Sequence, residues 1–189
     1  MVAIPEEVIG AGYAAPITFD DWIANYPEDK VTELINGELV SFPFPDDRHQ
    51  GVLTKLGFQF VTIAKSRVQA EVWFGLNVRL SAYDGPIPEL VVYTGKAGGI
   101  LTEYGIDGPP DLVVEILDEW SRENDLIDKF VLYAKGGIPE YWIVDPEEQI
   151  LIVCSLASET YSQSLYREGI VHCSALDGAA INLSSIWDS

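Results

Sequence analysis

The apolar residues of this chain recur at two spacings, one typical of helices and one typical of strands. Helical spacing runs from His49 to about Ala64, which predicts a helix of about four turns. It returns over residues 121–135, where Gly136-Gly137 follows at the position in which helices commonly end. The residues that carry the pattern are Val52, Leu53, Leu56, Phe60 and Ile63 in the first stretch and Leu126, Ile127, Phe130, Val131 and Ala134 in the second.

Shorter helical segments are expected near both ends of the chain. Thr18 begins a capping pattern, with Asp20 and Asp21 in the first turn, where carboxylates suit the helix dipole. Pro27 is expected to stop this helix, and a last helical turn is expected near residues 183–187. We expect residues 1–17 to form an irregular arm and residues 18–189 to form a single domain.

Strands are expected where Val, Leu and aromatic residues dominate. Alternation around Asn36-Gly37 predicts a hairpin over residues 31–40, because the tight turn needs positive φ at both positions. The nearly continuous apolar run 111–117 is typical of a central strand that is covered on both faces. The glycine-rich stretch 98–108 is predicted to be a loop. The other expected strands are 68–80, 87–93, 140–145, and an antiparallel pair over 149–154 and 159–166.

The order of these elements predicts the fold class. Strand, helix and strand over residues 111–145 predict a crossover, in which the helix connects two parallel strands of a mixed sheet. The sequence therefore predicts an α/β domain with a mixed central sheet flanked by helices, an N-terminal hairpin and antiparallel C-terminal strands.

Charge and composition restrict the partners. Thirty acidic residues against 11 basic ones give a net charge of −19, and such a surface gains little affinity for phosphates by counterion release. Either the partner is not nucleic acid, or the few lysine and arginine residues cluster at one place. Composition alone favours a partner other than nucleic acid. The start of the chain does not resemble a signal peptide, and no apolar run reaches the roughly 20 residues of a membrane helix. We expect a cytoplasmic protein in which Cys154 and Cys173 are free thiols.

Acids inside apolar strands are the first candidates for chemistry. Glu115 interrupts the run 111–117, where an unpaired carboxylate costs several kcal/mol unless it is paired, protonated or bound to a metal. Glu89 opens the strand after Pro88, and Glu33 lies in the predicted hairpin. Solvent exposure at a strand end or on a half-exposed hairpin explains each acid taken singly.

Lys129 lies on the apolar side of the helix that follows the Glu115 strand. A lysine in that position either extends its amine to solvent or meets an acid. Asp125, four residues earlier, offers a simple ion pair, but the helix packs back over the strand, so Lys129 can also reach the strand carboxylates. His49 and His172 have no obvious partners and are interpreted as structural or surface residues.

Three acids and one lysine on consecutive elements fit metal-assisted hydrolysis of a phosphodiester. Carboxylates are the ligands of Mg²⁺, for which Mn²⁺ is the usual substitute; the ion polarises the phosphate, and the lysine stabilises the attacking hydroxide or the developing charge. Two other hypotheses stay open: a catalytically inactive module for binding or assembly, and hydrolysis of a small phosphorylated molecule. A basic strip of Arg122, Lys129 and Lys135 beside the acids would favour the enzyme.

The order of motifs resembles a known family. TELINGEL, then a helix with His49 near its start, then the Pro-Glu strand, PPDLVVEIL and DLIDKFVLYAKGGIPEYWIVDPE together resemble the Uma-type endonuclease family of the PD-(D/E)XK nuclease-like superfamily, over roughly residues 18–155. The resemblance implies a restriction-endonuclease-like fold and a metal-dependent nuclease.

The resemblance also implies roles for single residues. Glu89 and Glu115 would bind the metal, Glu33 would support them, and Lys129 would replace the lysine that the superfamily carries two residues after the strand acid, where this chain has Leu117. Two departures are Glu89, where the family usually has Asp, and Asp118-Glu119, which add acids beside the site.

Trp73, Phe74 and Trp142 are explained equally well by a homodimer contact and by core packing.

Overall fold

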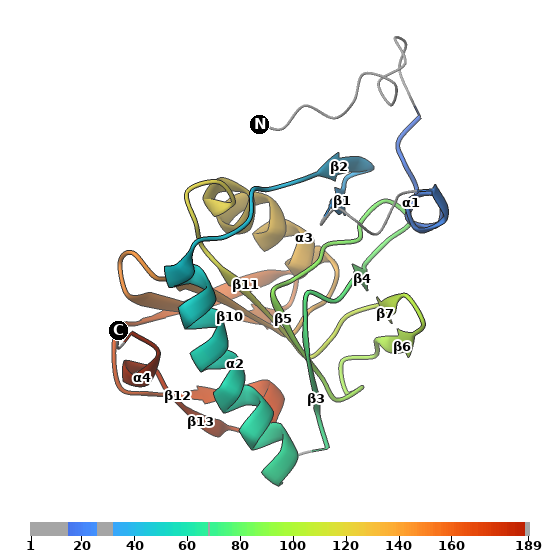
Figure 1. The fold of residues 1–189 in the computed structure, drawn as a ribbon. Helices are drawn as coiled ribbons and strands as arrows, with labels where there is room; N and C mark the ends of the chain where they lie inside the picture. Colours follow the sequence, from blue (N-terminus) through green and yellow to red (C-terminus); the bar gives the residue numbers. More distant parts are fainter. Residues whose placement is uncertain (1–14, 26–31, 68, 188–189) are drawn as a thin grey trace.

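A mixed six-stranded sheet forms the centre of the computed structural model, which describes residues 15–25, 32–67 and 69–187 (Figure 1). Its strand order is β11-β10-β9-β8-β5-β3, and only β8 and β9 run parallel to each other. The strands are β3 (Glu71–Phe74), β5 (Leu90–Tyr93), β8 (Leu112–Ile116), β9 (Glu140–Asp145), β10 (Ile150–Ala157) and β11 (Thr160–Tyr166). The predicted parallel crossover over residues 111–145 and the antiparallel C-terminal pair are confirmed.

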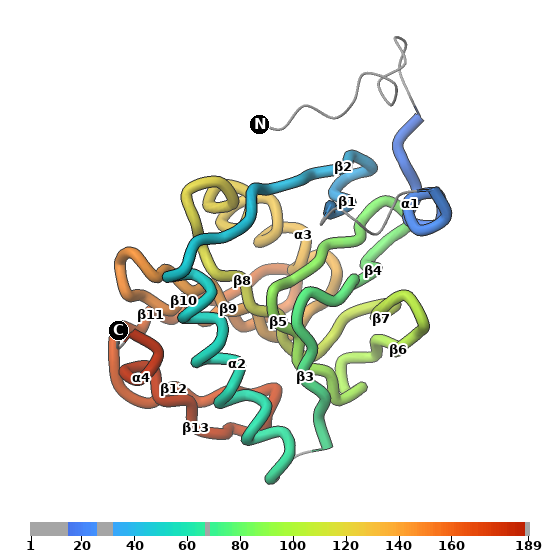
Figure 2. The backbone as a smooth tube through the Cα atoms, in the orientation of Figure 1, coloured from blue at the N-terminus to red at the C-terminus, as the bar shows by residue number. Residues whose placement is uncertain are grey.

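Two helices cover opposite faces of this sheet. Helix α2 (Asp47–Arg67) packs Leu56 and Phe60 against one face, and α3 (Lys129–Lys135) packs Tyr133 against the other. Figure 2 traces the chain from β8 into α3 and on to β9. The second predicted helix is not uniform, because a π-helical turn (Asn124–Asp128) precedes α3. Gly136 and Gly137 end α3 as expected, with Gly137 at φ 78°.

The N-terminal elements agree with their sequence signals where they are described. Helix α1 (Phe19–Asn25) is capped by Thr18, whose hydroxyl oxygen accepts a hydrogen bond from the N–H of Asp21 at 3.1 Å. The hairpin consists of β1 (Glu33–Ile35) and β2 (Glu38–Val40), and Asn36 and Gly37 both have positive φ. Pro27 and residues 1–14 of the predicted arm lie outside the described residues.

The prediction of a loop over residues 98–108 was wrong. This stretch forms a hairpin of β6 (Ile100–Thr102) and β7 (Gly105–Asp107), and β7 pairs with β4 (Val78–Arg79). All of β6 is exposed, so no alternation of apolar and polar residues marked it as a strand. Gly105 has a φ of 130°, and a Cβ there would lie 2.2 Å from the Asn77 carbonyl oxygen, so the glycine permits close pairing.

Three other details extend or correct the predictions. The expected strand 68–80 is divided between β3 of the central sheet and β4 of the small one. A further hairpin, β12 (Ile170–Cys173) and β13 (Ala179–Asn182), joined through a 3₁₀ turn (Ser174–Leu176), was not predicted. The final helical turn is confirmed as α4 (Ser184–Trp187).

The burial of Trp142 and of the two cysteines tests what was expected of them from the sequence. Trp142 is fully buried and contacts Phe60 edge to face at 5.4 Å between ring centroids, so it belongs to the core and not to an apolar edge. Trp73 and Phe74 remain 38% and 50% exposed. Cys154 and Cys173 are free and buried, as expected for free thiols, in clusters on opposite faces of the sheet. Among the described residues, no helix is long and apolar enough to cross a membrane.

Candidate active site

Glu115 occupies a buried position on the central strand β8. Along β8, alternation places Val113, Glu115 and Leu117 on the face that α3 covers, and Val113 and Leu117 belong to the apolar cluster there. Glu115 is only 2% exposed. A carboxylate in these surroundings needs partners that compensate for the lost water.

Lys129 is the centre of the compensating network. Its Nζ lies 2.9 Å from Oε1 of Glu115, 3.0 Å from Oε1 of Glu33 and 3.3 Å from Oδ1 of Asp125. Tyr133, one helical turn further on, donates its hydroxyl to the same Glu115 oxygen at 2.5 Å. All five side chains are buried, so the attraction between Lys129 and the acids, and the repulsion among the acids, are weakly screened.

Lys129 directly follows the π-helical turn. The N–H of Lys129 bonds to the carbonyl of Asn124, five residues earlier, whereas the N–H of Asp125 makes an ordinary bond to Ser121, four residues earlier. The additional residue per turn shifts the helix face, and such bulges occur frequently at functional sites. Across this turn Asp125 and Lys129, four residues apart, contact each other, and Lys129 contacts Glu115.

Glu33 joins the N-terminal hairpin to the site. Its Oε1 accepts the backbone N–H of Ile87 at 2.8 Å and contacts Lys129, which fixes β1 against the segment that leads into β5. Its other oxygen, Oε2, is buried without a hydrogen-bond donor among the described residues. Glu33 is 5% exposed, so the alternative of a half-exposed hairpin acid was wrong.

Glu89 lies beside Glu115 at the end of the neighbouring strand. Leu90 pairs with Val114, so the antiparallel register, continued by one residue, sets Glu89 opposite Glu115. Oε2 of Glu89 accepts the N–H of Ile116 at 2.7 Å, and Oε1 contacts Nε2 of His49 at the start of α2. The side chain is 24% exposed, so this end of the site reaches the surface.

The pKa shifts follow from burial and from the surplus of acids. Burial raises the pKa of Glu115 well above its usual value, although the charge of Lys129 opposes this. Burial lowers the pKa of Lys129, but Glu115, Glu33 and Asp125 outweigh it, so the ammonium is retained to unusually high pH. Burial also raises the pKa of Glu89 against the influence of His49.

His49 was interpreted from the sequence as lacking a partner, and the structure corrects this. The imidazole is 2% exposed and lies against Glu89, while its backbone N–H donates to Oδ1 of Asp46 at 2.8 Å. Burial lowers the pKa of His49, but the hydrogen bond and charge of Glu89, with Asp118 and Asp46, raise it overall. The position of His49 at the start of a helix gave no signal of this long-range contact.

The structure thus brings Glu33, Glu115 and Lys129 into direct contact and sets Glu89 beside them. Sequence reasoning did not include Asp125, Tyr133 and His49 among the site residues. The ion pair between Asp125 and Lys129, considered as the simple alternative, coexists with the larger network. Asp125 and Tyr133 lie four residues before and four residues after Lys129, and this helical spacing was the signal that could have identified them.

The basic strip that would have favoured an enzyme does not form. Arg122 pairs with Asp145 at 2.8 Å and with Glu147 at 3.7 Å. Lys135 is exposed at the end of α3, six residues and about 240° around the helix from Lys129. Arg122 and Lys135 therefore do not extend Lys129 into a basic strip.

The donor set can be tested against a magnesium ion. Across the described ranges, no three His, Cys, Asp or Glu side chains are arranged as a ready metal site. Mg²⁺ needs fewer protein ligands, because it keeps several waters and binds through one or two carboxylates. The facing carboxylates of Glu89 and Glu115 meet that requirement, and the unpartnered Oε2 of Glu33 adds an acceptor without a donor.

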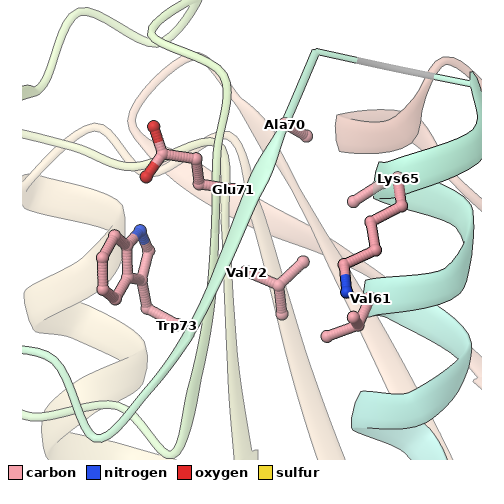
Figure 3. A pocket seen from close by; sticks show the side chains of 7 residues that line it. Val61, Lys65, Ala70, Glu71, Val72 and Trp73 are labelled. Atoms are coloured by element: carbon pink, nitrogen blue, oxygen red, sulfur yellow. The ribbon is translucent and has the colours of Figure 1, made fainter.

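The surface hollow between α2 and β3 is separate from this site. It encloses about 240 Å³ and is lined by Lys65, Glu71 and Trp73 among others. Figure 3 shows Val72 directed toward α2, while Glu71 and Trp73 point to the other side of the strand. None of the buried site residues lines it, so it is not the entrance to the carboxylates.

Comparisons with known proteins identify the family. A model of the Uma2 family, described as putative restriction endonucleases, matches residues 18–184. The chain belongs to this family. The predicted family resemblance is confirmed, and the match extends past the expected residue 155.

A solved structure confirms the fold class. The crystal structure of a putative nuclease from Anabaena variabilis superposes with a TM-score of 0.73 at 18% sequence identity, covering 91% of this chain and 98% of that one. At this identity the likeness establishes a nuclease-like fold. No protein of curated function shows significant sequence similarity to the chain.

Proposed function

We propose that this family member is a Mg²⁺-dependent endonuclease, in which Glu89 and Glu115 bind the ion, Glu33 supports them and Lys129 acts on the reacting groups. The observation that best supports this is a surplus of buried negative charge. Three buried carboxylates, from Glu33, Glu115 and Asp125, and the partly exposed carboxylate of Glu89 face one lysine and one histidine. Uncompensated buried charge is costly, and a bound cation would relieve it.

The two proposed ligands are fixed by the backbone. Glu89 and Glu115 stand opposite each other on antiparallel neighbours, where facing Cβ atoms are typically about 5 Å apart. Each carboxylate is also held in place, Glu89 by the Ile116 N–H and His49, and Glu115 by Tyr133 and Lys129. A bound Mg²⁺ would polarise the phosphodiester and lower the pKa of a coordinated water.

Lys129 would supply the fixed positive charge. Its three acidic neighbours keep the ammonium protonated at neutral pH, and burial holds it in place. A cation preorganised beside the metal ligands stabilises negative charge that develops on phosphate oxygens, or orients the attacking hydroxide. Asp125 and Tyr133 would act indirectly, by setting the position of Lys129 and of the Glu115 carboxylate.

An inactive binding or assembly module is the second candidate, and one observation favours it. Lys129 is already neutralised by three carboxylates, and Arg122 is paired with Asp145 and Glu147. The net charge of −19 further opposes binding of a polymeric phosphate. In this alternative the network would hold the hairpin, sheet and helix together without turnover.

A cleavage assay separates the two candidates. Labelled DNA and RNA, single-stranded and duplex, are incubated with Mg²⁺, Mn²⁺ or EDTA. We expect metal-dependent cleavage that Glu115→Gln, which keeps the shape of the side chain, slows at least about a hundredfold. Glu140→Gln is the matched control, because Glu140 is equally buried on β9 and lies outside the site; it is expected to cleave normally.

Calorimetric titration of Mn²⁺ and Mg²⁺ provides a readout without substrate. Binding by the wild type that is lost in Glu115→Gln and kept in Glu140→Gln would support the proposed ligands. A folded wild type that cleaves none of the substrates and binds neither ion would contradict the enzyme and favour the module.

A further inference from the structure

Two aromatic side chains stand out on the surface beside the candidate site. Phe44 is 94% exposed and Trp120 is 58% exposed. Single apolar residues on a surface are ordinary, but these two come from the loops that lead directly to and from site residues. Phe44 lies five positions before His49, and Trp120 lies between Glu115 and Lys129 in the chain.

Local structure holds each aromatic outward. Pro43 and Pro45 flank Phe44 and restrict the backbone on both sides of it. The carboxylate of Asp118 accepts the N–H groups of Trp120 and Ser121, both at 2.7 Å, so the turn that carries Trp120 is fixed. Rigid presentation lowers the entropic cost of binding a flat ligand.

The two loops belong to one region of the surface. The charge of Asp118, two residues before Trp120, acts on His49 at the start of α2, and Asp46, two residues after Phe44, bonds to the His49 backbone. In the view of Figure 2, the connection from β2 to α2 passes the chain that follows β8. The two loops that carry the aromatics therefore both lead to the end of the sheet where His49 contacts Glu89 and Glu89 reaches the surface.

Charge limits what the aromatics can bind. The basic residues nearest to Trp120 in the chain, Arg122 and Lys129, are engaged by carboxylates, and Arg48 follows Asp46 and Asp47 directly. A duplex offers mainly its phosphates to such a surface and gains little from it. Unpaired bases offer a flat uncharged face, and aromatic stacking binds them without regard to sequence.

We propose that Phe44 and Trp120 form a stacking platform for unpaired bases, which makes single-stranded nucleic acid the substrate class of this protein. The proposal rests on the proposed nuclease function for its use, but binding can be measured without cleavage. It reconciles an acidic surface with a nucleic-acid substrate, because the affinity would come from bases and only weakly from the phosphate backbone.

Fluorescence anisotropy with labelled 12-nucleotide dT and rU strands tests the platform. EDTA is included so that no strand is cut, and a duplex of equal length is the comparison. We expect single strands to bind more tightly than the duplex, with each of Phe44→Ala and Trp120→Ala weakening binding about tenfold. Phe58→Ala is the matched control, because Phe58 is 72% exposed on α2 and belongs to neither loop; it should change binding by less than about twofold.

Salt dependence provides a second measurement. One phosphate contact changes the logarithm of the single-strand association constant by about 0.7 per decade of salt, and we expect a slope near this value. Unchanged affinity in the double variant Phe44→Ala/Trp120→Ala would overturn the platform. Equal weakening by Phe58→Ala, tighter binding of the duplex, or a salt slope that corresponds to several phosphate contacts would also overturn it. The same holds if the wild type binds no single strand, or if Phe44 and Trp120 mediate self-association of the protein and not strand binding.

Failure of the platform and failure of the nuclease would look different. Metal-dependent cleavage with the same kcat/KM in the wild type and the double variant would overturn the platform and leave the nuclease standing. Strand binding that requires both aromatics, with no cleavage in Mg²⁺ or Mn²⁺, would support the platform and contradict the nuclease.

Discussion

Glu115 and Glu140 are buried glutamates on the paired strands β8 and β9, each 2% exposed, and they solve the same problem in opposite ways. Glu140 accepts hydrogen bonds from neutral donors, which include the indole N–H of Trp142 at 2.7 Å and the backbone N–H of Ala175 at 2.9 Å. Glu115 meets the charged Lys129 and the Tyr133 hydroxyl, with Glu33, Asp125 and Glu89 as further acids nearby.

The difference shows what distinguishes a structural buried acid from a candidate functional one. The partners of Glu140 tie strand β9 to the turn before β13, and both of its oxygens are satisfied within the fold. The acids around Glu115 outnumber their cations and leave Oε2 of Glu33 without a donor. Buried polar groups are normally satisfied, so the unbalanced cluster around Glu115 supports the proposed cation, whereas Glu140 gives no such support.

Replacing Lys129 should produce the largest effect on this comparison. Lys129→Met leaves three buried carboxylates without their cation, and breaking such a network typically costs about 3–5 kcal/mol. The free energy of unfolding is measured in urea.

Asp125→Asn in the same background is the control. Removing one of the acids should recover part of the lost stability, and it keeps the test usable if Lys129→Met alone does not fold. Full additivity of the two substitutions would contradict the coupling that the contact at 3.3 Å implies.

A smaller effect is expected at Tyr133. Tyr133→Phe removes the hydroxyl that donates to Glu115 at 2.5 Å and leaves the ring in its packing. Hydrogen bonds to charged groups contribute about 1.5–3 kcal/mol, and a loss of this size is expected in thermal unfolding. Stability equal to the wild type would mean that Lys129 alone is sufficient for Glu115.

The smallest effect concerns Glu140 and is seen in the pH dependence. Burial raises the pKa of Glu140 above its usual value near 4.5, although the Trp142 and backbone hydrogen bonds oppose this. The folded state therefore holds the proton when the unfolded state has released it, so this contribution to stability is complete below the ordinary pKa. It is lost as the pH rises through the folded pKa.

Glu140→Gln removes this titration. The wild type should lose stability relative to the variant as the pH rises from about 4 to 7, in unfolding curves measured across that range. A constant difference between the two proteins would show that Glu140 keeps an ordinary pKa. The substitution itself should cost about 1 kcal/mol, because the amide of glutamine cannot accept both hydrogen bonds.

Periodicity was sufficient for the main elements and insufficient for the contacts between them. The hairpin at Asn36-Gly37, helix α2, strand β8 and the parallel crossover have local patterns that the structure confirms. The β6–β7 hairpin has none, since its apolar residues Ile100 and Leu101 are exposed and its pairing depends on Gly105 beside Asn77.

The candidate site divides in the same way. Glu115 was conspicuous because an acid in an apolar run is costly, and the helix after its strand led to Lys129. The contact between His49 and Glu89 joins positions 40 residues apart, and no local pattern encodes such a distance. Asp125 and Tyr133 lie four residues before and four residues after Lys129 and share its helical face, but this spacing alone does not show that the face contacts Glu115.

That turn gives the site an unusual sensitivity to chain length. The N–H of Lys129 bonds five residues back, so the helix holds one residue more than a regular one would. Deleting one residue between Asp125 and Lys129 would allow a regular helix and shorten their spacing from four residues to three, which changes the direction of one side chain relative to the other. The strands of the sheet would still pair, so a relative that lost this one residue in evolution would keep the fold and lose the present arrangement of Asp125 and Lys129.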